Sequence, residues 1–546
     1  MNRSLAIWAA VFVVSLSAFL CHFYYLNQFG FYEDDYWATV SFIGEKPSKI
    51  WSIFAEAFRE WPQGRPLNHS LPKVQAILGM HLGGIDGIYA IACAGLILNS
   101  LLVFALLRRL FGEKSALIGA ILYVFFPADV TRPFLVHAAH VQGSLTFFLL
   151  GSWLWFRGGW WRLTGYLVAS LSLLAYETAF LPFLTIPLLA GDNLRATWRP
   201  WGKHLLACGG IVIAYSILRF SRGETRAVAV LSDPWTTTQQ ALSSLYLGPM
   251  TSGTRMIQAP FEGLGLLDPI AVSCALLVGF GAYLTLKLGR SRANVDGADD
   301  NRPLKARAAL YLIACALATW AGSYALTFVN YPPTQTMGRL TSTHTAAAWS
   351  VALLGCVVVA WLRGIAFPRF LRGLAYALGL AYVIGSVGFS QWVQREYARS
   401  WQLQQAYWRQ VVTLTPEARD GWSVIVVGLP APTSHVIGTT SWADILVYRG
   451  LLNANVDFAR LDPYSSLKVS RQDGTLRWTP EFWNGQFRTI DEDKLIILKS
   501  DGLGLERVTE AVTEDGVVLH GKAASGARVS PSNTPLSAAM WATPGG

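Results

Sequence analysis

Apolar segments long enough to cross a lipid bilayer recur along most of this chain. A helix that spans the hydrocarbon core needs about 20 predominantly apolar residues. Charged residues make up only 14% of the 546 residues, whereas a soluble domain carries about a quarter. The pattern therefore predicts a mainly α-helical, polytopic transmembrane bundle in residues 1–392.

We predict about eleven spans, two or three of them short for a bilayer. The first has no small-x-small cleavage site and is too long for a signal-peptide core, so we interpret it as an uncleaved span. The predicted spans are Leu5–Leu26, Ile85–Leu107, Ser115–Phe126, Ala138–Phe156, Leu163–Ala175, Ala179–Ala190, His204–Leu218, Pro269–Leu286, Ala308–Phe328, His344–Leu362 and Leu371–Trp392.

The distribution of basic residues predicts the orientation in the membrane. Cytoplasmic loops carry an excess of Lys and Arg. A turn at Tyr176-Glu177 puts the basic clusters around Arg157 and Arg199 on the same side, whereas one long helix would separate them. This favours a cytoplasmic N-terminus and an extracytoplasmic C-terminus, in a protein of the bacterial inner membrane. The basic residues behind the net charge of +10 are then distributed according to the side of the membrane, so this charge does not indicate nucleic-acid binding.

The remainder of the chain is more polar. Residues 393–524 predict a small extracytoplasmic α/β or β-rich domain, and residues 525–546 are rich in Ser, Pro, Gly and Ala and predict disorder. The domain is expected to begin with an amphipathic helix over Gln394–Leu414. The strands expected after it are Trp422–Gly428, Ile445–Tyr448, Lys494–Leu498 and Val517–His520.

An acidic run follows the first predicted span, where residues 31–37 read FYEDDYW. Adjacent carboxylates repel one another, which raises the pKa of at least one of them toward the range of a general base. The run of Glu33, Asp34 and Asp35 therefore contains candidate catalytic residues, Asp34 and Asp35, although charge runs are commonly solvated surface features.

The order of features around this run is more specific than the run itself. An amphipathic helix is predicted over Pro47–Glu60, followed by a span ending in arginines and a short span ending at Phe126-Pro127. This order resembles the GT-C glycosyltransferases, the multi-span class that includes protein O-mannosyltransferases and aminoarabinose and arabinosyl transferases. The resemblance covers roughly residues 5–218 well and the rest in outline.

The resemblance implies inverting transfer of a sugar from a polyprenyl-phosphate donor to a glycan, lipid or protein acceptor at the extracytoplasmic face. An outer-loop Asp is the general base of that class, which assigns the role to Asp34, with Asp35 as the alternative. The class often has Asp-Glu at this point, so the identity of the base stays open. Some members use a divalent cation and others do not, so metal use is open as well.

Further site residues follow from the same resemblance. In the second outer loop, Asp129 could orient the acceptor or bind a cation, and Arg132 could hold phosphate; His137 and His140 come next. Glu177, at the predicted outer turn, is a further candidate substrate-binding residue and the one acid that could lie deep in the membrane. The arginines expected on the outer side as donor-phosphate ligands are Arg65, Arg219, Arg222, Arg255 and Arg339. Arg339 is favoured because its loop carries no other charge.

Two other classes of function remain. A transporter or flippase usually places ionisable groups near the membrane midplane and interrupts helices there, whereas most acids here fall in predicted outer loops. A non-catalytic scaffold that presents the C-terminal domain is the other alternative. Neither a Walker loop nor a GxGxxG motif after a strand is present, so nucleotide chemistry is not supported.

Overall fold

The computed structural model describes residues 3–223, 232–288, 304–326, 332–429, 434, 441–461, 468–479, 488–502, 504–513, 515–524, 526 and 534–542. The chain divides into two compact units. Unit 1 comprises Met1–Leu26 and Lys46–Arg395, and unit 2 comprises Asn27–Glu45 and Glu396–Gly546. The acidic run therefore belongs to the same unit as the C-terminal region, from which it is separated by some 350 residues of sequence.

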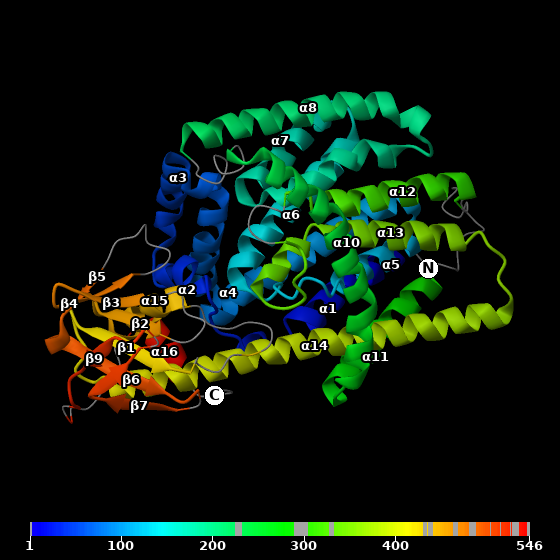
Figure 1. The fold of residues 1–546 in the computed structure, drawn as a ribbon. Coiled ribbons are helices and arrows are strands. Elements are labelled where there is room, and N and C mark those ends of the chain that lie inside the picture. The colour runs from blue at the N-terminus through cyan, green and yellow to red at the C-terminus, as the bar shows by residue number, and fades with distance from the viewer. Residues whose placement is uncertain are drawn as a thin grey trace. The chain divides into compact units, whose positions relative to one another are not determined.

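Unit 1 is helical (Figure 1). Its elements are α1 (Arg3–His22), η3 (Pro47–Lys49), α3 (Ile50–Glu60), η4 (Pro62–Gly64), α4 (Pro66–Phe111), α5 (Glu113–Val124), α6 (Leu135–Arg157), α7 (Trp161–Ala175), η5 (Glu177–Ala190), α8 (Leu194–Ser221), α10 (Pro234–Gly265), α11 (Pro269–Leu288), α12 (Ala306–Gly322), η6 (Arg339–His344), α13 (Ala347–Leu362) and the first part of α14 (Arg369–Leu414). Within the described residues, five helices are long and apolar enough to cross a membrane: α1, α4, α8, α11 and α14. The count of eleven spans stays a prediction.

Helix α4 begins earlier than expected. The second span was predicted to start at Ile85, but the helical segment starts at Pro66 and is broken at Gly83 and Gly84. Gly84 has a φ of +67°, a conformation that favours glycine. The two parts pack against each other, because a Cβ at Gly87 would lie 2.2 Å from the carbonyl oxygen of Gly79. The break thus makes two helices of one apolar stretch.

The predicted break before Glu177 is present in the structure. Helix α7 ends at Ala175, and Tyr176 is extended, with φ −151° and ψ 104°. The next element, η5, is a 3₁₀ helix over Glu177–Ala190 that contains Pro182 and Pro187. Proline lacks the N–H group that a regular α-helix needs at each interior position, which disfavours an α-helix over this segment.

Helix α14 is continuous where two helices were expected. The predicted span Leu371–Trp392 and the predicted amphipathic helix Gln394–Leu414 form one helix over Arg369–Leu414. No glycine or proline interrupts residues 389–414. In unit 1, Gln391 and Gln394 donate hydrogen bonds to the carbonyl oxygen of Leu20 in α1.

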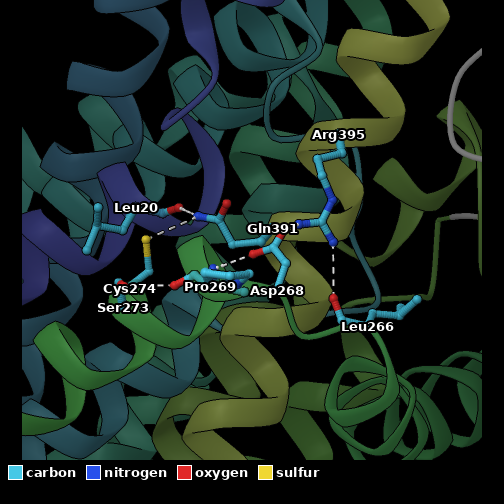
Figure 2. Close-up of polar contacts among 9 residues, drawn as sticks. Leu20, Leu266, Asp268, Pro269, Ser273, Cys274, Gln391 and Arg395 are labelled. Atoms are coloured by element: carbon cyan, nitrogen blue, oxygen red, sulfur yellow. Dashed lines mark hydrogen bonds and ion pairs between the residues drawn. The ribbon is translucent and has the colours of Figure 1, made fainter.

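Arg395 extends this network to the N-terminus of α11 (Figure 2). Its guanidinium pairs with Asp268 and donates to the carbonyl oxygen of Leu266 at 3.1 Å. Asp268 also accepts a hydrogen bond from the backbone N–H of Ala271 at 2.7 Å, which satisfies one of the free donors in the first turn of α11. These contacts join α1, α11 and α14 through polar groups.

Unit 2 combines the second part of α14 with a small α/β region (Figure 1). A four-stranded sheet has the order β2-β1-β6-β7, with β1 parallel to β2 and β6, and β7 antiparallel to β6. Its strands are β1 (Ser423–Gly428), β2 (Asp457–Leu461), β6 (Leu495–Ser500) and β7 (Leu505–Val508). The shorter sheets contain β3 (Lys468–Gln472), β4 (Thr475–Thr479) and β5 (Arg488–Ile490), and β8 (Glu510–Val512) and β9 (Val518–His520).

The strand predicted at Ile445–Tyr448 is wrong. This stretch lies in helix α15 (Ser441–Leu452), which connects β1 to β2. Ala443, Val447 and Leu451 are buried at four-residue spacing, which is a helical period. A short apolar run does not distinguish a buried strand from a buried helix, and here the parallel pairing of β1 with β2 requires a crossover.

Part of the segment predicted to be disordered forms a helix, α16 (Pro535–Trp541). Leu536 and Met540 are buried on one face of it. Arg409 of α14 donates to the carbonyl oxygens of Met540 and Ala542, both at 2.9 Å. Packing and hydrogen bonds within unit 2 thus order a segment whose composition alone suggests disorder.

Candidate functional site

The acidic run is held by aromatic residues of unit 2. The hydroxyl group of Tyr32 donates to the carbonyl oxygen of Tyr397 at 2.8 Å, and the hydroxyl group of Tyr36 donates to Gln404 Oε1 at 2.8 Å. Trp401 lies against Gly30, where a Cβ would come within 1.8 Å of its ring. The run is therefore fastened along one face of α14.

The three carboxylates differ in environment. Asp35 is buried, and its Oδ2 accepts a hydrogen bond from the backbone N–H of Tyr32 at 3.1 Å. Glu33 is also buried and has a φ of +40°, which is unusual for a residue with a side chain. Asp34 is partly exposed, at the start of the short helix α2 (Asp35–Ala38). Asp34 is thus the acid of the run with solvent access.

Burial also affects the tyrosines beside these acids. It raises the pKa of both Tyr32 and Tyr36, and the charge of Asp35 raises both values further. Asp444 in α15 acts on Tyr36 in the same direction. Asp444 forms a buried ion pair with Arg460 of β2 at 2.9 Å. Helix α15 therefore supports the acidic run from the α/β region.

A second polar cluster lies in unit 1, around Glu177. Glu177 Oε1 pairs with the guanidinium of Arg65, at the start of α4, and lies 3.7 Å from Arg219 Nη1, near the end of α8. All three side chains are largely buried. Burial alone would raise the pKa of Glu177, but the two arginines more than offset this and lower it. The carboxylate is therefore charged at neutral pH.

Tight backbone geometry presents Arg65. Trp61, Gln63 and Gly64 all have positive φ values in the turn between α3 and α4. Tyr215 of α8 donates a hydrogen bond to the carbonyl oxygen of Gly64 at 2.7 Å, and Arg219 donates to that of Gln63 at 3.2 Å. This turn is thus clamped by α8, and strained backbone held by its surroundings is a common property of binding sites.

Aromatic and imidazole groups extend the cluster toward η6. The Arg65 guanidinium lies 5.5 Å from the ring centre of Tyr176, and His140 of α6 lies 6.0 Å from the same ring. His137 is 5.5 Å from His140, ring centre to ring centre, and interacts electrostatically with Arg339. Tyr176 also interacts with Ser342 of η6, the element that begins at Arg339. We call Arg65, His140, Tyr176, Glu177 and Arg219 the Glu177 cluster; Arg339 and His137 adjoin it.

Asp129 ties two segments of unit 1 together. Its Oδ1 accepts hydrogen bonds from the backbone N–H and the hydroxyl group of Thr131, at 2.9 and 2.7 Å. Its Oδ2 accepts from the hydroxyl group of Thr345 at 2.8 Å. The backbone N–H of Val130 donates to Thr341 of η6 at 3.2 Å. These contacts support η6, so the geometry favours a positioning role for Asp129.

The other predicted arginines are engaged elsewhere. Arg132 is buried and donates to the carbonyl oxygens of Tyr123 and Val124, both at 2.5 Å, at the end of α5. Arg222 is exposed and donates to the carbonyl oxygen of Arg59 at 2.6 Å. Arg255 forms a bidentate pair with Glu262, at 2.8 and 3.1 Å. These contacts account for the three side chains in structural terms.

Two contacts of Arg65 were not predicted from the sequence: its position beside the Tyr176 ring and its ion pair with Glu177. Arg65 and Glu177 are 112 residues apart, and no local motif links them. The signal available was the order Arg65-Pro66 at the start of an apolar stretch together with an acid between two short spans. Among the described residues, His, Cys, Asp and Glu side chains form no group of three that could hold a metal ion.

No protein-family model matches the chain, and no curated protein matches it significantly.

Proposed function

We propose that this protein is an integral membrane glycosyltransferase that uses a polyprenyl-phosphate-linked sugar. The observation that carries the proposal is the Glu177 cluster of unit 1, where Arg65 and Arg219 share one oxygen of a buried carboxylate. An Arg–carboxylate pair is often bidentate, so this arrangement leaves guanidinium groups suited to a further anion. A phosphate group offers the oxygens that such groups bind.

The position of the cluster suits a lipid-linked anion. Its residues lie just before α4, within α6 and α8, and at the junction of α7 and η5; of these helices, α4 and α8 are long and apolar enough to cross a membrane. An isoprenyl chain requires apolar helices beside the phosphate site, and buried charge pairs there are stronger than exposed ones. Arg339, next to His137, is a further phosphate ligand in this proposal.

The proposed chemistry is a single displacement at the anomeric carbon. Asp34 removes the proton from an acceptor hydroxyl group, and the resulting oxygen attacks the anomeric carbon with inversion. The bond from that carbon to the phosphate oxygen breaks, and polyprenyl phosphate leaves with the electron pair. The arginines stabilise the negative charge that grows on the leaving phosphate. Asp34 suits the role because it is the partly exposed acid of the run.

A transporter or flippase of a lipid-linked sugar is the second candidate. The observation that favours it is the break in α4 at Gly83 and Gly84, because interrupted helices are frequent in transporters. It requires the same anion-binding cluster but no proton acceptor. The two candidates therefore differ in whether a bond to the sugar is broken.

Purified protein in detergent, incubated with polyprenyl-phosphate sugars carrying a labelled sugar, tests the proposal. A glycosyltransferase releases polyprenyl phosphate and moves the label to an added glycan, lipid or protein acceptor. Reconstitution in vesicles with the same donors tests the alternative. Movement of intact donor across the bilayer without cleavage would favour the flippase and contradict glycosyl transfer.

A further inference from the structure

The ion pair between Arg65 and Glu177 has an unusual geometry for a structural contact. Both arginines of the cluster approach the same carboxylate oxygen, Oε1. The Nε atom of Arg65 is buried and has no hydrogen-bond partner in the part of the chain that the structure describes. A buried donor without a partner is energetically unfavourable. Glu177 Oε2 is also buried without a hydrogen-bond partner among the described residues, so the contact engages only one of the two carboxylate oxygens.

The Arg255–Glu262 pair in the same unit shows the contrast. There, each terminal nitrogen of one arginine binds its own carboxylate oxygen, at 2.8 and 3.1 Å. That pair is the planar, two-point contact that stabilises guanidinium and carboxylate together. Arg255 Nε is likewise buried without a hydrogen-bond partner in the described part of the chain, so the two pairs differ in how many carboxylate oxygens are engaged. The contact at Glu177 is one-point and shared. A carboxylate held in this way competes less well with a ligand that offers several oxygens.

We propose that Glu177 is an internal substitute for an anionic ligand, and that a phosphate monoester or diester displaces its carboxylate from Arg65 on binding. The inference rests on the proposed function in taking the donor's phosphate as the natural ligand. Glu177 keeps the buried arginine neutralised when no ligand is bound. Binding therefore exchanges one anion for another and does not place a new charge pair in a low-dielectric site.

The backbone holds the two partners of this ion pair in different ways. Glu177 is the first residue of η5 and follows Tyr176, which is extended and separates η5 from α7. Arg65 is held more firmly, by the turn at Gly64 that α8 clamps through Tyr215. The carboxylate thus lies at an element boundary, whereas the arginine that recognises the anion lies on the constrained side.

Binding measurements on the purified, full-length chain test the exchange. The probes are inorganic phosphate and farnesyl phosphate, with affinity taken from titration calorimetry and from the thermal shift of Trp fluorescence. In E177Q the competing charge is gone, so the affinity for farnesyl phosphate should rise roughly 10- to 100-fold. E262Q, which alters the bidentate pair, is the matched control and should leave the affinity unchanged.

The second variant assigns the effect to Arg65. R65A should bind farnesyl phosphate weakly, and the double variant E177Q/R65A should lose the gain of E177Q. A gain in affinity for both probes indicates that phosphate alone suffices, and a gain for farnesyl phosphate only indicates a lipid-linked ligand; both support the exchange. E177Q with affinity equal to or below that of the parent would overturn it.

If E177Q does not fold, E177D provides the same test. Its shorter side chain keeps the charge but draws it away from Arg65, so the affinity should rise less than in E177Q and still exceed that of the parent. No rise in E177D would contradict the inference. These assays measure binding only, so they are independent of the test for sugar transfer. If the protein transfers sugar but E177Q shows no gain in affinity, the exchange is contradicted and the proposed function stands. If E177Q shows the gain but the protein transfers no sugar, the proposed function is contradicted and the exchange stands.

Discussion

The acidic run of unit 2 and the Glu177 cluster of unit 1 solve the same physical problem in different ways. Both place acidic side chains in largely buried surroundings, which is costly unless the groups are paired or hydrogen-bonded. In the run, Asp35 accepts a hydrogen bond from the nearby Tyr32 backbone, three residues before it. In the cluster, Glu177 is paired with two arginines that are each more than 40 residues away from it in sequence.

The difference indicates what each region tolerates. A run supported by its own backbone and by flanking tyrosines keeps its shape when one carboxylate loses its charge. A cluster held together by attraction between its own opposite charges is left with an unpaired charge when a charged member is replaced. Substitutions in the run should therefore affect chemistry more than stability, and substitutions in the cluster should affect binding and stability together.

The largest expected effect is at Asp34. Asp34→Asn should lower the rate of sugar transfer by about 10²- to 10⁴-fold, because a proton acceptor contributes on that scale, and should leave melting temperature unchanged. Asp35→Asn alters a buried carboxylate and should lower the melting temperature. Turnover and melting are measured for both, with exposed Asp473→Asn as control. Near-normal turnover in both variants would contradict the assignment of a catalytic carboxylate to this run.

Arg339 should have the next largest effect. Arg339→Ala should weaken donor binding roughly 10- to 100-fold, as expected for loss of a charge-assisted contact with phosphate. Arg339→Lys should restore part of the loss, because an ammonium group cannot make a two-point contact. Donor affinity and turnover are measured in one detergent. Exposed Arg372→Ala is the control, and parent-like binding by Arg339→Ala would identify Arg339 as an interface anchor.

Substitution of Arg132 should have the opposite pattern of effects to substitution of Arg339, with a loss of stability and no change in donor binding. Its guanidinium donates to two carbonyl oxygens at the end of α5, where a positive charge also interacts favourably with the helix dipole. Arg132→Ala should lower the free energy of unfolding by about 2 to 4 kcal/mol. Donor affinity of the folded fraction should not change. A weaker affinity at unchanged melting temperature would reassign Arg132 to the phosphate.

Tyr36→Phe measures how firmly the run is attached to α14. Loss of the hydrogen bond to Gln404 should cost about 0.5 to 1.5 kcal/mol. Hydrogen exchange in residues 29–42 should become faster, and turnover should fall only modestly. Tyr246→Phe removes an exposed hydroxyl group of α10 and serves as control. Unchanged exchange in Tyr36→Phe would show that the run holds its shape without this contact.

The smallest effect is a dependence on pH in the cluster. The pKa of Glu177 is lowered in the folded protein by Arg65 and Arg219, despite burial; Tyr176 and His140 also interact electrostatically with this group. Its stabilising contribution is therefore complete above the ordinary glutamate pKa of about 4.3 and is lost as pH falls through the lowered value. Melting temperatures of the parent and E177Q should converge at acidic pH, and a constant difference would contradict the pairing.

Much of the secondary structure could be predicted from local pattern. The first apolar segment, the break before Glu177 and the strands at β1, β6 and β9 were expected close to their observed positions. The strand at Ile445–Tyr448 was not, because four apolar residues fit either a helix or a strand until their partners are known. Helix α16 was missed because its order depends on contacts with Arg409 and other distant residues.

The sequence by itself determined that the chain is rich in long apolar helices and that three acids stand together after the first of them. Both properties are local, since a helix and a charge run are defined by neighbours along the chain. Only the tertiary structure decided that Arg65 pairs with Glu177, that Arg132 caps α5 and that the acidic run packs with the C-terminal region. Such pairings depend on where the backbone carries residues that are far apart in sequence, and a single sequence contains no local signal for that path.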